Sequence, residues 1–220
     1  SDKKLIIEIL GGNLFGFTKL FKDITQDYLR LKTSRAVKTV SLDGALYVRL
    51  DPFTNQNIAQ KLESLGLRIK HVPFTEWLDF LNSLSDNEFQ KNKIKNLFNN
   101  YLRKRIRTIP NSIVYKNLGV PRFSELETKL NEISPYIGSE SVGEAILSIG
   151  SSMALHKKSQ IDGIINICPF GCLQCKVADS IVKDSSTDII TKSIEFNEDP
   201  IDQALITDFV FDLEYHEKGK

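Results

Sequence analysis

The sequence contains little sulfur and few histidines. It has three cysteines, three histidines and one methionine among 220 residues. The cysteines all fall in one short segment, at Cys168, Cys172 and Cys175. Three cysteines so close together cannot form a balanced disulfide framework, and they suit metal ligation or redox chemistry in a reducing compartment better. A disulfide-stapled scaffold is therefore not expected.

Long hydrophobic runs are also missing. No apolar run approaches the roughly 20 residues that a helix needs to span a bilayer, and the N-terminus has no basic region followed by an apolar core. We therefore expect a cytoplasmic location, with no membrane partner. The chain begins Ser-Asp-Lys-Lys and its one methionine is Met153, so we also expect it to be a piece of a longer protein. A processed N-terminus or the end of a cleaved tag is the alternative.

Neither sign of charge predominates, because the sequence has 29 lysines and arginines and 28 aspartates and glutamates. The protein therefore has no large net positive charge that would attract it to nucleic acid or to an anionic membrane. A basic stretch at residues 103–107 has helical periodicity around it, and a solvated helix face is the better interpretation of these charges. We expect no nucleic-acid partner.

Short apolar runs alternate with helical patterns along most of the chain. After residue 37 the succession of strand, loop, helix and strand is typical of a parallel sheet. The sequence therefore predicts an α/β fold with a three-layer parallel sheet of the flavodoxin or Rossmann type. Strands are predicted at residues 5–10, 37–42, 67–72, 164–167 and 189–196. Helices are predicted at residues 17–31, 55–66, 75–108, 123–133, 142–155 and 172–183, and from residue 201 onward.

The domain organisation follows from where this alternation is interrupted. Residues 1–36 are predicted to be an N-terminal helical lead-in, and residues 37–220 an α/β domain. A helical insertion is predicted within that domain at about residues 75–136, with a connection at residues 110–121. Ser139 or Ser141 is expected to cap the helix that follows the insertion. The tail from Glu217 is expected to be frayed.

The cysteine segment combines a buried strand with a helix start. Residues 164–167 form an apolar run, which Pro169 and Gly171 then break. Apolar side chains recur afterwards at helical spacing, so the turn at residues 168–172 is predicted to lead into the N-terminus of a helix. Unpaired backbone amides and the helix dipole stabilise thiolates and anions at that position. Any chemical site of this protein is expected here.

Several kinds of chemistry fit three closely spaced cysteines. The spacing matches that by which radical S-adenosylmethionine enzymes hold a four-iron cluster, but those enzymes place it after the first strand of a barrel, and little of this chain follows Cys175. Zinc would need a fourth ligand, and His71, His156 and His216 are all distant in sequence. Buried cysteines that only fill a core are a third interpretation.

Carboxylates are expected near the cysteines. In open α/β sheets the carboxyl ends of the strands border a shared crevice. If the strands are parallel, Asp43, Cys168 and Glu195 would project into that crevice, and Glu144 would lie near it. An ordinary exposed carboxylate is the alternative for each of the acidic residues.

Four motifs together resemble a known family. They are the sequence Gly-Ala-Leu-Tyr-Val-Arg-Leu-Asp-Pro-Phe-Thr-Asn at residues 44–55, Gly-Glu-Ala at residues 143–145, Asp-Gly-Ile-Ile-Asn-Ile-Cys-Pro-Phe-Gly-Cys-Leu at residues 162–173, and a late strand that enters an acidic turn at residues 195–199. In this order they resemble the C-terminal part of the large CoA-substrate-specific enzyme activases related to 2-hydroxyacyl-CoA dehydratases.

The resemblance implies a function for the cysteine motif. In that family the last cysteine of Pro-Phe-Gly-Cys is thought to ligate an iron–sulfur cluster whose other cysteines lie on an upstream domain, and this role falls to Cys172. The implied partners are upstream domains of the parent chain and a CoA-ester dehydratase component. The chain would serve electron transfer and would have no catalytic activity alone. The alternative is a non-catalytic interaction or structural module with inert cysteines.

Further site residues are implied by the motif loops, namely Arg49, Asp51, Asn55, Glu144 and Glu195. This chain departs from the family pattern at Ala45, where glutamate is usual, and at Gln174, where proline is usual. Two of the cysteines are not part of that pattern, so either the chain has a self-contained cluster site or those thiols are incidental.

All three cysteines, Cys168, Cys172 and Cys175, are candidate ligands of an iron–sulfur cluster. Cys172 and Cys175 share one helical face, while Cys168 lies across the Pro169 turn. Three thiolates can hold one corner of a cubane cluster and leave its fourth iron for an outside ligand. A cluster held by one domain would be exposed, so the isolated chain is expected to carry none after purification in air.

Overall fold

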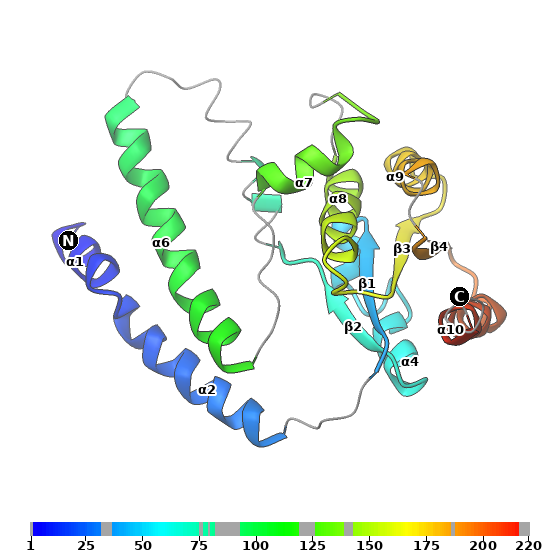
Figure 1. Ribbon diagram of the computed structural model, residues 1–220, viewed down its shortest axis with the longest axis horizontal. Coiled ribbons are helices and arrows are strands. Elements are labelled where there is room, and N and C mark those ends of the chain that lie inside the picture. Colours follow the sequence, from blue (N-terminus) through cyan, green and yellow to red (C-terminus); the bar gives the residue numbers. More distant parts are fainter. Residues whose placement is uncertain are drawn as a thin grey trace. The chain divides into compact units, whose positions relative to one another are not determined.

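The chain divides into two compact units in a computed structural model (Figure 1). The structure describes residues 2–31, 37–74, 77–78, 80–81, 93–118, 126–138, 143–185 and 188–215. One unit is helical and comprises Ser1–Arg35 and Leu81–Phe123; the other is an α/β unit of Ala36–Phe80 and Ser124–Lys220. The expected lead-in and the main helix of the expected insertion thus belong to one unit, and each unit is described by itself below.

The helical unit contains α1 (Asp2–Gly11), η1 (Leu14–Gly16), α2 (Phe17–Leu31) and α6 (Lys93–Leu118). Both α1 and α2 pack against α6. The Arg105 guanidinium of α6 donates to the carbonyl oxygens of Ile9 and Leu10 at 3.3 and 2.8 Å. The Leu10 carbonyl, which the last turn of α1 leaves without a helical partner, is satisfied in this way, and the Ile9 carbonyl also accepts from the Gly12 N–H at 3.2 Å.

Two predictions for this unit are wrong. Residues 5–10 form part of α1 rather than a strand, because packing of Ile9 in the unit's interior outweighs the strand preference of isoleucine. The connection predicted at residues 110–121 is instead helical as far as Leu118, since α6 continues through Pro110. Packing against α1 and α2 compensates for the one N–H donor that proline lacks. The helix predicted at Phe17–Leu31 is confirmed.

The α/β unit is built on a four-stranded sheet in which every strand is parallel to its neighbours. The strands are β1 (Thr39–Gly44), β2 (Arg68–His71), β3 (Gly163–Pro169) and β4 (Ile190–Phe196), in the spatial order β2-β1-β3-β4. This confirms the predicted parallel α/β fold. The order is that of the first four strands in a flavodoxin-like sheet, whose direction of winding reverses between β1 and β3.

Helices cover both faces of this sheet (Figure 1). One face carries α3 (Leu46–Leu50), α4 (Ile58–Ser64) and α10 (Gln203–Tyr215), and the other carries α7 (Leu126–Ile133), α8 (Glu144–His156) and α9 (Leu173–Asp184). Successive side chains of a strand point to opposite faces. Ile165 and Ile167 of β3 therefore pack with the first set, while Ile164 packs with the second. Two hydrophobic cores make this a three-layer unit.

Several boundaries in this unit differ from the sequence predictions. The end of the apolar run after Gly44 is the short helix α3, and α7 packs on α8 within the α/β unit instead of extending an insertion. Helix α8 begins at Glu144 with Gly143 as its N-cap. The predicted caps Ser139 and Ser141, and the tail from Glu217, lie outside the described residues.

Gly44 is the point of closest approach between β1 and β3. Its φ angle is +110°, and a Cβ atom there would overlap the Ile167 carbonyl oxygen and lie 2.8 Å from the Ile167 carbonyl carbon. The next residue continues the contact, because the Ala45 N–H donates to the same oxygen at 3.0 Å. Both the backbone angle and the lack of space therefore require glycine at this strand end.

We predict that Gly44→Ala lowers the free energy of unfolding by roughly 2 to 5 kcal/mol, since the new methyl group must displace backbone. Gly143→Ala is the matched control. A Cβ atom at Gly143 would meet only the end of the flexible Gln174 side chain, so its cost should stay below about 1 kcal/mol. Urea unfolding followed by circular dichroism measures both values. Equal losses in the two variants would contradict this account of Gly44.

Candidate functional site

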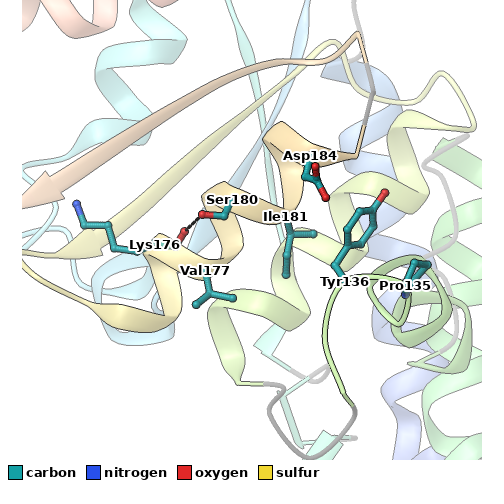
Figure 2. Close-up of a pocket in the computed structure, with 7 residues that line it drawn as sticks. All are labelled: Pro135, Tyr136, Lys176, Val177, Ser180, Ile181 and Asp184. Carbon is teal, nitrogen blue, oxygen red and sulfur yellow. Dashed lines mark hydrogen bonds between the residues drawn. The ribbon is translucent and has the colours of Figure 1, made fainter.

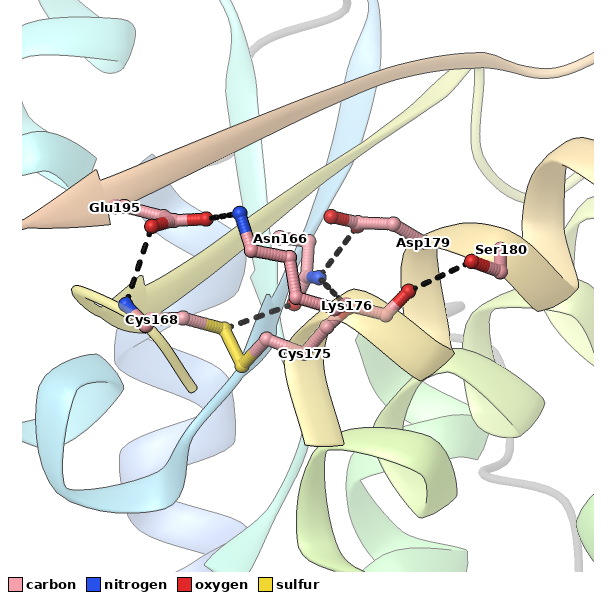
Figure 3. A network of polar contacts seen from close by, with 8 residues as sticks. Asn166, Cys168, Cys175, Lys176, Asp179, Ser180 and Glu195 are labelled. Atoms are coloured by element: carbon pink, nitrogen blue, oxygen red, sulfur yellow. Dashed lines mark hydrogen bonds and ion pairs between the residues drawn. A yellow bond between two sulfur atoms is a disulfide. The ribbon is translucent and has the colours of Figure 1, made fainter. Parts of the chain in front are cut away.

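The three cysteines come together where β3 ends and α9 begins. Cys168 of β3 and Cys175 of α9 are buried, lie 6.3 Å apart between Cα atoms and form a disulfide (Figure 3). Cys172 is the N-cap of α9 and keeps a free, half-buried thiol. It packs against this pair together with Ala145 of α8. The predicted turn from strand to helix is confirmed, and it gathers every sulfur of the cysteine side chains.

The three sulfurs are nevertheless not equivalent. The sequence analysis predicts three equivalent thiolate ligands. In this structure Cys168 and Cys175 are bonded to each other, and only Cys172 has a thiol. Within the described ranges, no three or more histidine, cysteine, aspartate or glutamate side chains are arranged to hold a metal ion. In this disulfide state the site thus offers one cysteine ligand.

The histidines do not join the cysteines. His156 ends α8 at the opposite end from Ala145, and its ring nitrogen Nδ1 lies 3.5 Å from the Ile161 carbonyl oxygen. His71 ends β2, where burial lowers its pKa and the charge of Arg49 lowers it further. His216 lies outside the described residues. Neither described histidine therefore supplies the additional ligand that a zinc site would need.

Asn166 of β3 ties the cysteine pair to helix α9. Its side-chain amide donates to the Asp179 carboxylate at 2.6 Å and to the Cys175 carbonyl oxygen at 3.4 Å (Figure 3). Its Oδ1 atom lies 3.6 Å from the Cys168 sulfur. A disulfide sulfur carries no hydrogen, so this last approach is a contact and becomes a hydrogen bond only when Cys168 is a thiol.

Glu195 of β4 holds the cysteine loop from the other side. It lies opposite Cys168 in the strand register, accepts the Gly171 N–H at 3.2 Å and forms an ion pair with Lys176 (Figure 3). The hydrogen bond from Lys176 and then that from Gly171 lower the pKa of Glu195, and the same pairing raises the pKa of Lys176. The predicted crevice carboxylate is thus a clamp on the loop.

Asp43 does not project into a crevice. It is fully buried and accepts a hydrogen bond of 2.8 Å from the Ser41 hydroxyl, which in turn accepts one of 2.6 Å from Ser152 of α8. Side chains at alternate positions of β1 face α8, so this polar group lies inside the layer between sheet and helix. The expectation that Asp43 and Cys168 open onto a shared crevice is wrong, because helices cover both.

The polar residues of the motif at residues 44–55 shape their own loop. The buried Arg49 guanidinium donates to the Val72 carbonyl oxygen at 3.0 Å, and the buried Asn55 amide donates to the Val48 carbonyl oxygen at 2.8 Å. Asp51 accepts from the Thr54 hydroxyl and from nearby backbone N–H groups, which lowers its pKa. These hydrogen bonds account for the three polar residues of the motif by their role in the loop structure alone.

The exposed part of the same loop is apolar, which the sequence reasoning missed. Phe53 is 91% exposed, and Tyr47 and Leu50 are also exposed. Tyr47, Leu50 and Asp51 line a shallow hollow of about 520 Å³ with Glu144 at the start of α8. No periodic pattern marks these residues as outward-facing, since an apolar run beside a strand ordinarily predicts burial.

A second hollow lies between the end of α7 and α9 (Figure 2). Its volume is about 640 Å³, and it is lined by Pro135, Tyr136, Lys176, Val177, Ser180, Ile181 and Asp184. The Lys176 side chain extends away from the other lining residues toward Glu195, and the Ser180 hydroxyl donates to the Lys176 carbonyl oxygen at 2.9 Å. These contacts occupy two of its polar side chains.

Comparison of the chain with protein-family models, with curated proteins and with solved structures gives no match. In the part of the chain that the structure describes, no helix is long and apolar enough to cross a bilayer.

We predict that the Glu195 clamp weakens in acid. Because its pKa is lowered from an ordinary value of 4.5, its pairing stabilises the folded state fully above that value, and the contribution is lost as the pH falls through the lowered pKa. The raised pKa of Lys176 means that the pairing is also lost when the pH rises through that pKa.

Amide hydrogen exchange at Gly171 measures this effect locally. Relative to wild type, Glu195→Gln should exchange faster at neutral pH, and the ratio should approach one in acid. Glu198→Gln, which changes a carboxylate in the neighbouring turn, is the control and should match wild type. A ratio for Glu195→Gln that does not change with pH would show that the ion pair does not hold the loop.

Proposed function

We propose that the α/β unit is a domain of an iron–sulfur electron-transfer or activator protein related to the 2-hydroxyacyl-CoA dehydratases. In this proposal Cys172 supplies a thiolate to a cluster shared with another domain. The observation that supports it most is the convergence of all three cysteines at the carboxyl end of β3, with Cys172 alone both free and partly accessible. Iron–sulfur clusters in proteins are held chiefly by such thiolates.

The start of α9 suits a negatively charged ligand. Cys172 is the N-cap of this helix of 12 residues, and it makes no side-chain capping hydrogen bond. The first N–H groups of a helix have no partners within it, and the helix dipole is positive at that end. A cluster bound at Cys172 would therefore meet a favourable field and N–H donors from the same helix.

The surroundings of Cys172 favour a cluster covered by a second domain. Phe170 and Leu173 flank the cysteine, with 76% and 75% of their surface exposed. Exposed apolar side chains of this size commonly mark an interaction surface. A domain that carries the remaining ligands would bury both side chains and exclude water from the cluster, which controls its stability and potential.

The other two cysteines fit the cluster only after reduction. While Cys168 and Cys175 form a disulfide, neither is a thiolate. Once reduced, both would stand beside Cys172 as additional ligands, and Asn166 and Glu195 would hold the loop and helix that carry them. A bound cluster would accept and deliver single electrons, and a CoA-ester dehydratase component is the proposed recipient.

A non-enzymatic interaction module is the second candidate function. It is favoured by the exposed Tyr47 and Phe53, together with the internal use of the polar residues Arg49, Asp51 and Asn55. In that case the cysteines would have no metal. Iron binding distinguishes the two candidates directly.

The test is anaerobic reconstitution with iron and sulfide after reduction of the chain. We predict that protein purified in air has no cluster, and that reconstitution produces a labile charge-transfer absorption at about 400 nm. Cys172→Ala should lose most of this absorption, because the accessible ligand is gone. Lys183→Ala, which changes an exposed side chain near the other end of α9, should keep it. Equal absorption from Cys172→Ala and wild type would remove Cys172 from the cluster site.

A further inference from the structure

The segment Cys172-Leu-Gln-Cys175 is a C-x-x-C sequence at the start of a helix, and Cys175 is already in a disulfide with a third cysteine. We propose that the three cysteines form a thiol–disulfide exchange site, in which Cys172 passes oxidising equivalents between the buried disulfide and an external dithiol or disulfide. This inference goes beyond the proposed cluster function and requires no iron.

The burial of the other two cysteines leaves this role to Cys172. Cys168 and Cys175 are 1% and 3% exposed. Thiol–disulfide exchange requires a thiolate to attack a disulfide sulfur directly, so access to that sulfur controls the rate. An external thiol is excluded from the buried pair, whereas Cys172 is half-buried and packs against it. Cys172 can thus reach the disulfide from inside and a solution thiol from outside.

The first step is internal. The Cys172 thiolate attacks the Cys175 sulfur, a bond forms between Cys172 and Cys175, and the bond between Cys175 and Cys168 breaks. Cys168 leaves as a thiolate and takes up the proton that Cys172 released. The number of disulfides is unchanged by this step. One sulfur of the new disulfide belongs to the accessible residue Cys172.

The next steps involve the external dithiol. One of its thiolates attacks Cys172, which releases Cys175 and leaves a mixed disulfide. The second thiol of the reagent then attacks the reagent sulfur that is bonded to Cys172. This closes the disulfide of the reagent and frees Cys172 as a thiolate. Two electrons and two protons pass to the protein, which gains two thiols, and the dithiol becomes a disulfide. An external disulfide drives the same steps in reverse.

The structure also provides a partner for the thiol that the first step releases. The Oδ1 atom of Asn166 lies 3.6 Å from the Cys168 sulfur, within reach of a weak S–H hydrogen bond. The Asn166 amide donates to Asp179 and Cys175, which directs Oδ1 toward Cys168. A purely structural disulfide has no use for such an acceptor, because its sulfurs have no hydrogen.

The rate of reduction by dithiothreitol tests the relay, with a chelator present to exclude metal. Thiols are counted over time by maleimide mass tagging of the folded chain. Cys172→Ser should be reduced about tenfold more slowly than wild type or slower, because the buried disulfide then waits for local opening. Lys183→Ala, which changes an exposed side chain near the other end of α9, serves as the control and should match wild type. Reduction of Cys172→Ser at the wild-type rate would overturn the proposal.

A second variant keeps the test decisive if Cys172→Ser folds poorly. Cys168→Ser retains Cys172 and Cys175 and removes the buried disulfide. On addition of oxidised glutathione, it should form a disulfide between Cys172 and Cys175, identified by peptide mapping, with release of two glutathiones per chain. A glutathione that stays on Cys172 without this second step would also overturn the proposal. Both tests are free of iron, so their outcome is independent of the cluster.

Discussion

The close approach of β1 and β3 at Gly44 is the constraint on which the site depends. The backbone of Gly44 and Ala45 lies against Ile167, one residue before Cys168. The Gly44 N–H also donates to the Ser148 hydroxyl of α8 at 3.0 Å. One glycine thus sets the distance between two strands and between sheet and helix. The position of the cysteine turn follows from that distance.

Much of the α/β unit could be predicted from the sequence, because its strands are continuous apolar runs separated by helical periods. The strand and helix around Cys168 and Cys172 were predicted in this way. The local sequence pattern predicted the wrong structure where contacts distant in sequence determine it. These places are α1, which packs on α6, and Pro110, which lies within α6. Pairing of Cys168 with Cys175 could not be predicted either, since it depends on the turn geometry between them.

The candidate site shows why motif residues and functional residues need not coincide. Arg49, Asp51 and Asn55 are the conspicuous polar residues of their loop, but each is engaged in hydrogen bonds with the chain itself. Glu195 likewise holds the Gly171 backbone. Buried backbone groups are nearly always hydrogen-bonded, and Arg49 and Asn55 pair with such carbonyl oxygens. Among the described residues near the cysteines, an accessible thiol and exposed apolar side chains are left for a partner.

The proposed exchange chemistry and the proposed cluster concern the same sulfurs in two oxidation states. The central claim of the cluster proposal is that Cys172 is an accessible ligand, and the most direct measurement of it is the iron and acid-labile sulfide content of the complete gene product, purified without oxygen under reducing conditions. The account predicts iron and sulfide in the wild-type protein and a large loss of both in Cys172→Ala. An iron-free wild-type protein, or equal iron in the variant, would contradict it.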